Sequence, residues 1–128
     1  MNDALTMAAL TAREHAFAPY SKFKVGAAIE DASGRIHTGC NIENATYGLT
    51  VCAERVALFK AISEGVRRFR RVAVAAGADR LTPPCGACRQ VLWEFCGDVE
   101  IILVNPQGDS ETLRLAELFP RAFDGSFL

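Results

Sequence analysis

Three cysteines in two separate motifs restrict how this chain can fold more than any other feature of its sequence. Cys52 and Glu54 lie close together where an apolar run begins, and Cys85 and Cys88 form a Cys-x-x-Cys pair preceded by two prolines. Three thiolates can occupy three of the four tetrahedral positions around a zinc ion and leave the fourth position open. If they do so here, the fold must bring the two motifs together.

Glu54 is the residue that would make such a zinc site catalytic. A carboxylate beside an open zinc site is typical of hydrolytic enzymes, in which it carries protons for the zinc-bound water. A glutamate in the first turn of a helix can also simply interact with the helix dipole. We favour the catalytic role, because Glu54 neighbours a candidate zinc ligand on a helix with almost no polar face.

The charge of the site suggests a role for Arg55. Three thiolates with one Zn²⁺ ion carry a net negative charge, which makes the metal a weaker acid. A cation that hydrogen-bonds to the sulfurs would offset this effect. We expect Arg55 to do so, rather than to lie on a solvated surface.

Two other uses of the Cys-x-x-Cys pair stay open. It could be a redox pair, although the usual thioredoxin-like context is absent. It could also belong to a closed structural zinc site with Cys40, Cys96 or His37 as the fourth ligand. On one helix Cys96 would lie about 12 Å beyond Cys88, too far to share a metal ion, whereas spacing does not exclude Cys40. We expect Cys40 and Cys96 to be small buried hydrophobic residues.

Length and composition indicate a single domain over residues 1–128. The net charge is −1, with 23% charged residues, so nothing would draw the chain electrostatically to nucleic acid polymers or anionic membranes. We find no signal-peptide pattern and no apolar run long enough to span a bilayer. The odd count of five cysteines then favours a reducing compartment, and we expect a cytoplasmic protein.

The apolar periodicity predicts an α/β chain with a mixed sheet. We expect helices over 4–16, 51–64 and 85–96, a helical turn over 115–119, and strands over 23–31, 35–41, 72–76, 99–104 and 111–113. The first two strands should form a hairpin. Asn2 or Asp3 is expected to cap the first helix, and Thr50 the second.

The apolar residues of the second helix indicate that the chain assembles with other subunits. They surround the helix on nearly every side: Val51, Ala53, Val56, Ala57, Leu58, Phe59, Ala61 and Ile62. One sheet in so small a chain cannot cover them all, so we expect another subunit to cover the rest. The alternative is an interior helix enclosed by its own chain.

The motifs Cys-Ala-Glu at 52–54 and Pro-Cys-Gly-Ala-Cys-Arg-Gln at 84–90 are highly specific together. With similar segments at 19–28, 39–48 and 118–123, the chain resembles the small nucleoside-salvage type of zinc-dependent cytidine deaminases. The resemblance implies a three-layer fold with a five-stranded mixed sheet and helices on both faces. It also implies a homotetramer with shared active sites. The reaction it implies is the deamination of cytidine and 2′-deoxycytidine to uridine and 2′-deoxyuridine plus ammonia, in pyrimidine salvage.

The resemblance also implies a role for individual residues. It makes Cys52, Cys85 and Cys88 the zinc ligands, Glu54 the proton shuttle for the water that attacks C4, and Arg55 the arginine that bonds the ligand sulfurs. The residues that it implies for the substrate are Phe23 and Ala53 at the base, Asn41 and Glu43 at the ribose, Tyr47 in a substrate loop, and Phe123 from a neighbouring subunit.

Two further alternatives concern the substrate and the class of protein. The cluster Arg67, Arg68, Arg70 and Arg71 is the one feature that would favour a polynucleotide substrate, and we expect it to be a solvated turn. A deaminase of the blasticidin type is disfavoured by the Asn41–Glu43 pair, which suits a ribose. A non-enzymatic zinc scaffold would need a fourth protein ligand.

Overall fold

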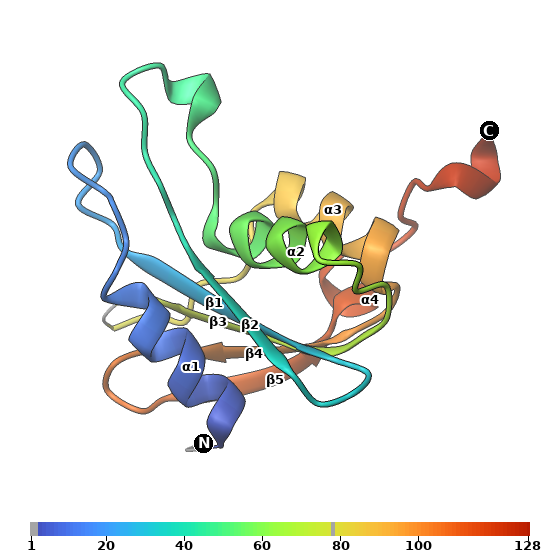
Figure 1. The fold of residues 1–128 in the computed structure, drawn as a ribbon, viewed down its shortest axis with the longest axis horizontal. Helices are drawn as coiled ribbons and strands as arrows, with labels where there is room; N and C mark the ends of the chain where they lie inside the picture. Colours follow the sequence, from blue (N-terminus) through green and yellow to red (C-terminus); the bar gives the residue numbers. More distant parts are fainter. Residues whose placement is uncertain (1–2, 78) are drawn as a thin grey trace.

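The computed structural model describes residues 3–77 and 79–128, which form an α/β fold (Figure 1). The helices are α1 (Ala4–Arg13), α2 (Ala53–Ser63), α3 (Gly86–Cys96) and α4 (Leu115–Leu118), with 3₁₀ turns η1 (Tyr47–Leu49) and η2 (Gly125–Phe127). The strands are β1 (Val25–Asp31), β2 (Ile36–Cys40), β3 (Phe69–Ala76), β4 (Glu100–Val104) and β5 (Ser110–Arg114). Each predicted helix and strand is present in the described residues.

The five strands form one mixed sheet in the order β2-β1-β3-β4-β5. Strands β1 and β2 form the predicted hairpin, and β3 and β4 are the parallel pair. Two neighbouring parallel strands need a crossover connection. Here α3 makes that crossover, and the loop before α3 carries Cys85, so the sheet topology itself fixes where this motif lies.

Helices cover both faces of the sheet, as predicted. In Figure 1, α1 lies on one side, and α2 and α3 lie on the other. The core follows this division, because side chains alternate between the two faces of a strand. On β1, Ala27 and Ile29 pack with α2 and α3, whereas Ala28 packs with α1.

Two glycines let helices approach the sheet closely. A Cβ atom at Gly26 would lie 2.2 Å from the carbonyl oxygen of Ala9 in α1. A Cβ atom at Gly39 would lie 2.5 Å from the amide nitrogen of Ala57 and 2.7 Å from the carbonyl oxygen of Ala53, both in α2. The first turn of α2 therefore rests directly on the backbone of β2.

The prediction that Thr50 caps the second helix was wrong. The N-cap is Cys52, because Val51 is held in an extended bridge with Ile42 and cannot enter the helix. The hydroxyl of Thr50 instead accepts a hydrogen bond from the amide of Asn44 at 3.0 Å.

Several other bounds were off by a few residues. Helix α1 ends at Arg13 rather than at 16, because the chain turns so that Phe17 can pair with Ile42. Strand β3 begins at Phe69, before the apolar run that predicted a start at Val72, and its first residues pair with the far end of β1. Asp3 caps α1 as predicted, and accepts a hydrogen bond from the amide of Thr6.

The surface of α2 is not fully covered by the chain itself. Phe59 is 44% exposed, so the alternative of an interior helix enclosed by its own chain is wrong. None of the helices within the described residues combines the length and the hydropathy that a transmembrane helix requires.

Candidate metal centre

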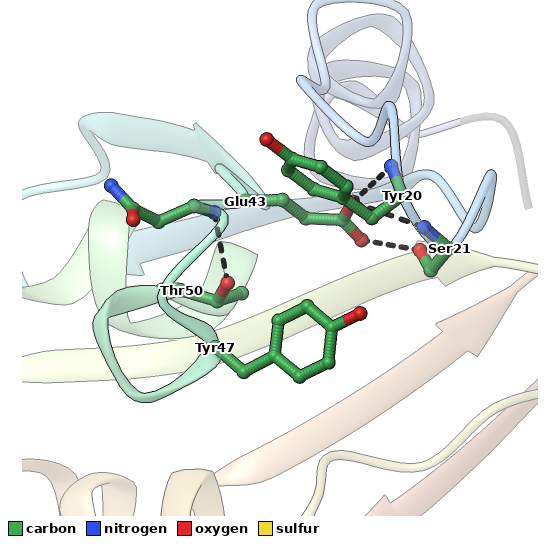
Figure 2. Close-up of a pocket in the computed structure, with 6 residues that line it drawn as sticks. Tyr20, Ser21, Glu43, Tyr47 and Thr50 are labelled. Atoms are coloured by element: carbon green, nitrogen blue, oxygen red, sulfur yellow. Dashed lines mark hydrogen bonds between the residues drawn. The ribbon is translucent and has the colours of Figure 1, made fainter.

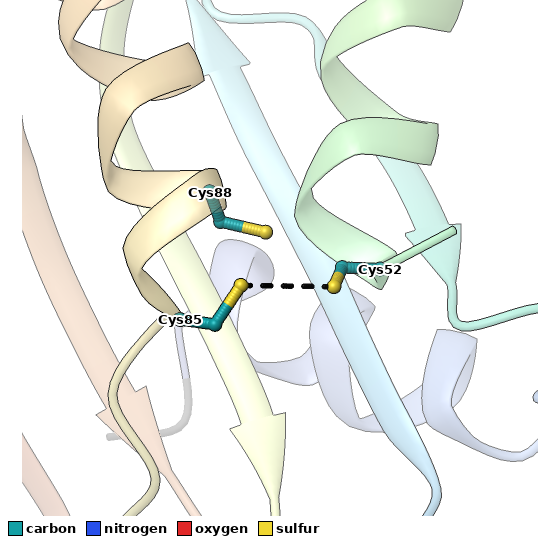
Figure 3. A group of neighbouring side chains, drawn as sticks. All are labelled: Cys52, Cys85 and Cys88. Atoms are coloured by element: carbon teal, nitrogen blue, oxygen red, sulfur yellow. Dashed lines mark hydrogen bonds between the residues drawn. The ribbon is translucent and has the colours of Figure 1, made fainter. Parts of the chain in front are cut away.

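Three cysteine sulfurs converge where α2 and α3 begin (Figure 3). Cys52 is the N-cap of α2, Cys85 is the N-cap of α3, and Cys88 lies in the first turn of α3. The three Sγ atoms lie within 4.8 Å of one another, and those of Cys52 and Cys85 are 3.9 Å apart. Sulfurs at the usual Zn–S distance in a tetrahedral site are about 3.8 Å apart. The cluster therefore fits a zinc ion.

No fourth protein ligand lies in this group among residues 3–77 and 79–128. Cys40 and Cys96 are outside it. The Nε2 atom of His37 lies 2.9 Å from Asp31 Oδ2, with which it forms a buried pair elsewhere. The alternative of a closed structural site with one of these residues as the fourth ligand is therefore wrong, and the described chain leaves one tetrahedral position open.

Arg55 reaches the cluster, as the charge argument predicted. Its Nη2 atom donates a hydrogen bond to Cys52 Sγ at 3.3 Å. Hydrogen bonds from Cys88 and then from Arg55 lower the pKa of the Cys52 thiol to about 5, against the opposing effect of burial. The neighbouring Cys52, together with burial, raises the pKa of Cys88. Without a metal the cluster thus favours one thiolate, and a dication would favour the release of further protons.

Glu54 is buried beside the sulfurs, with only 4% of its surface exposed. Burial, and then the negative charge of Cys52, raise the pKa of the Glu54 carboxyl to about 7. A group with a pKa near neutrality can both accept and release a proton at physiological pH, which is the property required of a general acid and base.

A cavity of about 240 Å³ joins the metal cluster to the candidate substrate residues. It is lined by Ser21, Phe23, Val25, Asn41, Glu43, Thr50, Cys52, Ala53, Glu54, Val74, Thr82, Pro83 and Cys85. Four residues expected at the substrate are among them: Phe23, Asn41, Glu43 and Ala53. Beside it lies a second pocket of about 360 Å³, lined by Tyr47 together with Tyr20, Ser21, Glu43, Asn44 and Thr50 (Figure 2).

Phe123 does not line either pocket in the single chain. It is 54% exposed and stacks on Phe127, with ring centroids 5.6 Å apart. The segment that carries both rings leads away from the sheet in Figure 1. Its base is fixed by two hydrogen bonds from α3, from Gln90 Nε2 to the Phe123 carbonyl and from Trp93 Nε1 to Asp124 Oδ2.

Asn41 and Glu43 hold the walls of the cavity together. Asn41 accepts a hydrogen bond from the Val25 amide at 2.9 Å and donates one to the Phe23 carbonyl at 2.8 Å. Glu43 accepts from the amides of Tyr20 and Ser21 and from the Ser21 hydroxyl (Figure 2). Both side chains thus bind the segment before β1 to the segment after β2.

Sequence reasoning missed several lining residues. Thr82 and Pro83 could have been inferred, because they directly precede the second cysteine motif. Nothing in the sequence marked Ser21 or Thr50 as a cavity-lining residue, because their positions depend on two loops that meet only in the folded chain. The place of Val74 in the cavity wall follows from the alternation of side chains along β3, but only once the neighbours of β3 in the sheet are known.

The family model described as the cytidine and deoxycytidylate deaminase zinc-binding region matches residues 1–104. The chain is 54% identical over 113 residues to a cytidine deaminase of Sporosarcina psychrophila, covering 88% of this chain and 83% of that protein. It is also 54% identical over 116 residues to one of Halalkalibacterium halodurans, covering 90% and 88%.

Solved structures show the same similarity. A cytidine deaminase structure from Burkholderia pseudomallei has a TM-score of 0.92 and 48% identity, covering 96% of this chain and 99% of that one. A second, from Mycobacterium tuberculosis, has a TM-score of 0.81 and 41% identity, with 94% of each chain covered. The matched residues 1–104 include both cysteine motifs and Glu54.

Proposed function

The chain belongs to the cytidine deaminase family, and we propose that it is a hydrolase that replaces the exocyclic amine of cytidine and 2′-deoxycytidine by oxygen. The products are uridine or 2′-deoxyuridine and ammonia, and one water is consumed. The observation that carries the proposal is the burial of Glu54 in the cavity that Cys52 and Cys85 also line.

Cys52, Cys85 and Cys88 would hold the zinc ion, and Arg55 would donate to the sulfur of Cys52. When bound, zinc supplies a Lewis acid that lowers the pKa of a coordinated water to near neutrality. Glu54 would accept one proton from the attacking water and pass it to N3 of the ring. It would then take the second proton from the same oxygen and pass it to the leaving amine, so that both protons of the consumed water are accounted for. Because burial keeps its pKa near 7, Glu54 can act in both directions at neutral pH.

The substrate contacts in this proposal come from the cavity walls. Phe23 packs on the base, and the backbone of Ala53 contacts it. A carboxylate has about four acceptor positions, and the loop around Ser21 occupies three of those of Glu43, so one remains for a sugar hydroxyl. Asn41 keeps one amide hydrogen for the same purpose, and Tyr47 lies at the outer pocket.

A small nucleoside suits this site better than a polynucleotide does. Two residues of the basic cluster already have partners: Arg71 pairs with Glu30 and Asp3, and Arg67 donates to the carbonyls of Ile62 and Val66. Free nucleosides as substrates, with thiolate ligands for the metal, fit pyrimidine salvage in the reducing cytoplasm.

We extend the proposal to a homotetramer with shared active sites. Exposed Phe59 on α2 and the exposed pair Phe123–Phe127 on the tail support subunit contacts. In this arrangement Phe123 enters the site of a neighbour. Light scattering after gel filtration should give four times the chain mass, and a monomer mass together with full activity would contradict this part.

The reaction is tested by the ultraviolet absorbance of cytidine mixed with the purified, zinc-loaded protein. Conversion to uridine, with release of one ammonia per nucleoside, is the expected result. A single-stranded oligonucleotide containing cytosine serves as the second substrate. Deamination of the oligonucleotide but not of cytidine would overturn the proposal.

A further inference from the structure

The hydroxyl of Ser21 contacts two residues of the proposed substrate site at once. It donates to Glu43 Oε2 and accepts a hydrogen bond from the Phe23 amide at 3.0 Å. A hydroxyl has one donor and two acceptor positions, so both bonds can exist together. One exposed side chain thereby connects the carboxylate expected at the sugar with the backbone of Phe23, the residue expected at the base.

The same loop fixes both oxygens of Glu43. Oε1 accepts from the amides of Tyr20 and Ser21, at 2.9 and 3.1 Å, while the Ser21 hydroxyl bonds to Oε2. These bonds, that of the Ser21 hydroxyl first, lower the pKa of Glu43, and the ionised carboxylate is an acceptor alone. The ring of Tyr20 also meets that of Tyr47 edge-on, with centroids 6.4 Å apart (Figure 2).

Without the Ser21 hydroxyl, Oε2 would lose the bond that fixes its direction. The two amide bonds to Oε1 leave the carboxylate free to rotate about that oxygen. The Phe23 backbone would keep the hydrogen bond that its carbonyl accepts from Asn41, and the remaining fold would be little affected because Ser21 is exposed. The consequence would be confined to the geometry of the site.

We propose that Ser21 is a positioning residue for sugar recognition: its hydroxyl aims the remaining acceptor position of Glu43 at a ribose hydroxyl. This inference rests on the proposed function, in which Glu43 binds the sugar. It adds a residue that acts on sugar binding through Glu43.

The test compares Ser21→Ala with Ser21→Thr, which keeps the hydroxyl. The substrates are cytidine and 2′,3′-dideoxycytidine, which lacks both ring hydroxyls of the sugar. For Ser21→Ala we expect a KM for cytidine about tenfold higher, with kcat changed less than about twofold, as for the loss of a hydrogen bond to a charged group. The KM for dideoxycytidine should not change, and Ser21→Thr should stay within about threefold of the wild type.

Ser33→Ala is the matched control, because Ser33 makes the same kind of bond to Asp31, at 2.6 Å in the turn between β1 and β2. It should leave both kinetic constants unchanged. In a Glu43→Gln background, removal of the Ser21 hydroxyl should have no further effect, because coupled residues are not additive.

These measurements distinguish a failure of the role of Ser21 from a failure of the proposed function. A KM that rises equally for both substrates, or does not rise for cytidine, overturns the role of Ser21. If the wild type binds dideoxycytidine as well as cytidine, sugar recognition by Glu43 fails and the proposed function must be revised. Zinc content measured for every variant confirms that the metal site is intact.

Discussion

The sulfur atoms of Cys52 and Cys85 lie 3.9 Å apart although the residues are 33 positions apart in the chain. Each residue is the N-cap of a different helix, and neither side chain is used to cap its helix. Because both helices begin beside the cluster, their dipoles favour thiolates and other anions there. The metal site thus depends on the placement of two helix starts on one face of one sheet.

The first prediction concerns Glu54. Glu54→Gln keeps the shape of the side chain but removes the proton acceptor, so we expect kcat for cytidine to fall by about 10³-fold. Zinc content should remain at the wild-type level, measured by atomic absorption. Glu94→Gln, the same change on the exposed side of α3, is the control and should leave kcat unaffected. Activity near that of the wild type in Glu54→Gln would rule out the role of general acid and base.

The second prediction separates ligand from non-ligand cysteines. Cys88→Ser should lose most of its zinc and melt at a lower temperature, since a metal that binds the folded chain stabilises it. Cys96→Ser should keep the metal. Burial raises the pKa of Cys96 to about 12, so its thiol stays neutral, and it lies at the other end of α3. Zinc content and thermal melting are measured for both variants. Equal loss of zinc in both would contradict the assignment of Cys88 as a ligand and of Cys96 as a non-ligand.

The third prediction concerns the close contact of α2 with β2. Gly39→Ala would place a Cβ atom 2.7 Å from the Ala53 carbonyl, so the helix must move. We expect a loss of about 1–3 kcal/mol in the free energy of unfolding, as for other overpacked sites. Zinc affinity should also fall, because the first turn of α2 follows Cys52. At Gly48 nothing lies within 4 Å of the same added atom, so Gly48→Ala is the control for stability in urea titrations. A Gly39→Ala protein as stable as Gly48→Ala would show that α2 tolerates the shift.

The fourth prediction concerns pH and the buried pair of Asp31 and His37. The contact with His37, and then the hydroxyl of Ser33, lower the pKa of Asp31. Its folded pKa therefore lies below the unfolded value of about 3.9, and its contribution to stability is complete above that pH and lost as the pH falls further. The difference in unfolding free energy between wild type and Asp31→Asn should shrink as the pH falls below about 4.

Urea denaturation at a series of pH values measures this difference. Loss of zinc at low pH affects both proteins and cancels in the comparison. Asp79→Asn, the same change at an exposed position, should show no trend with pH. If the difference for Asp31→Asn persists unchanged to about pH 3, the bonds to Asp31 do not carry the pH dependence.

Much of the fold could be predicted because its signals are local. The alternation of Val25, Ala27 and Ile29, and the apolar run from Val72, are patterns within single strands. The three cysteines could be recognised as a metal-binding group from their spacing and their place at helix starts. The burial of Glu54 beside them agrees with the apolar surroundings seen in the sequence, while its catalytic role stays a prediction.

The start of α2 could not be predicted, because Thr50 is a good N-cap by its local sequence alone. The bridge between Val51 and Ile42 overrides that preference, and only the folded chain brings these two residues together. The hydrogen bonds of Asn41 to Phe23 and Val25, and the pairing of Arg71 with Asp3 and Glu30, could not be predicted either, since each joins segments that are distant in the sequence.

By itself, the sequence determined which chemical groups the chain possesses and which helices and strands it forms, because residue type and periodicity act over a few neighbours. Only the tertiary structure decided that Cys52 becomes the N-cap of α2 and that Ser21 meets Glu43. These outcomes depend on how closely the helices rest on the sheet and on which loops share its edge. Such contacts form between segments far apart in the chain, so no local pattern encodes them.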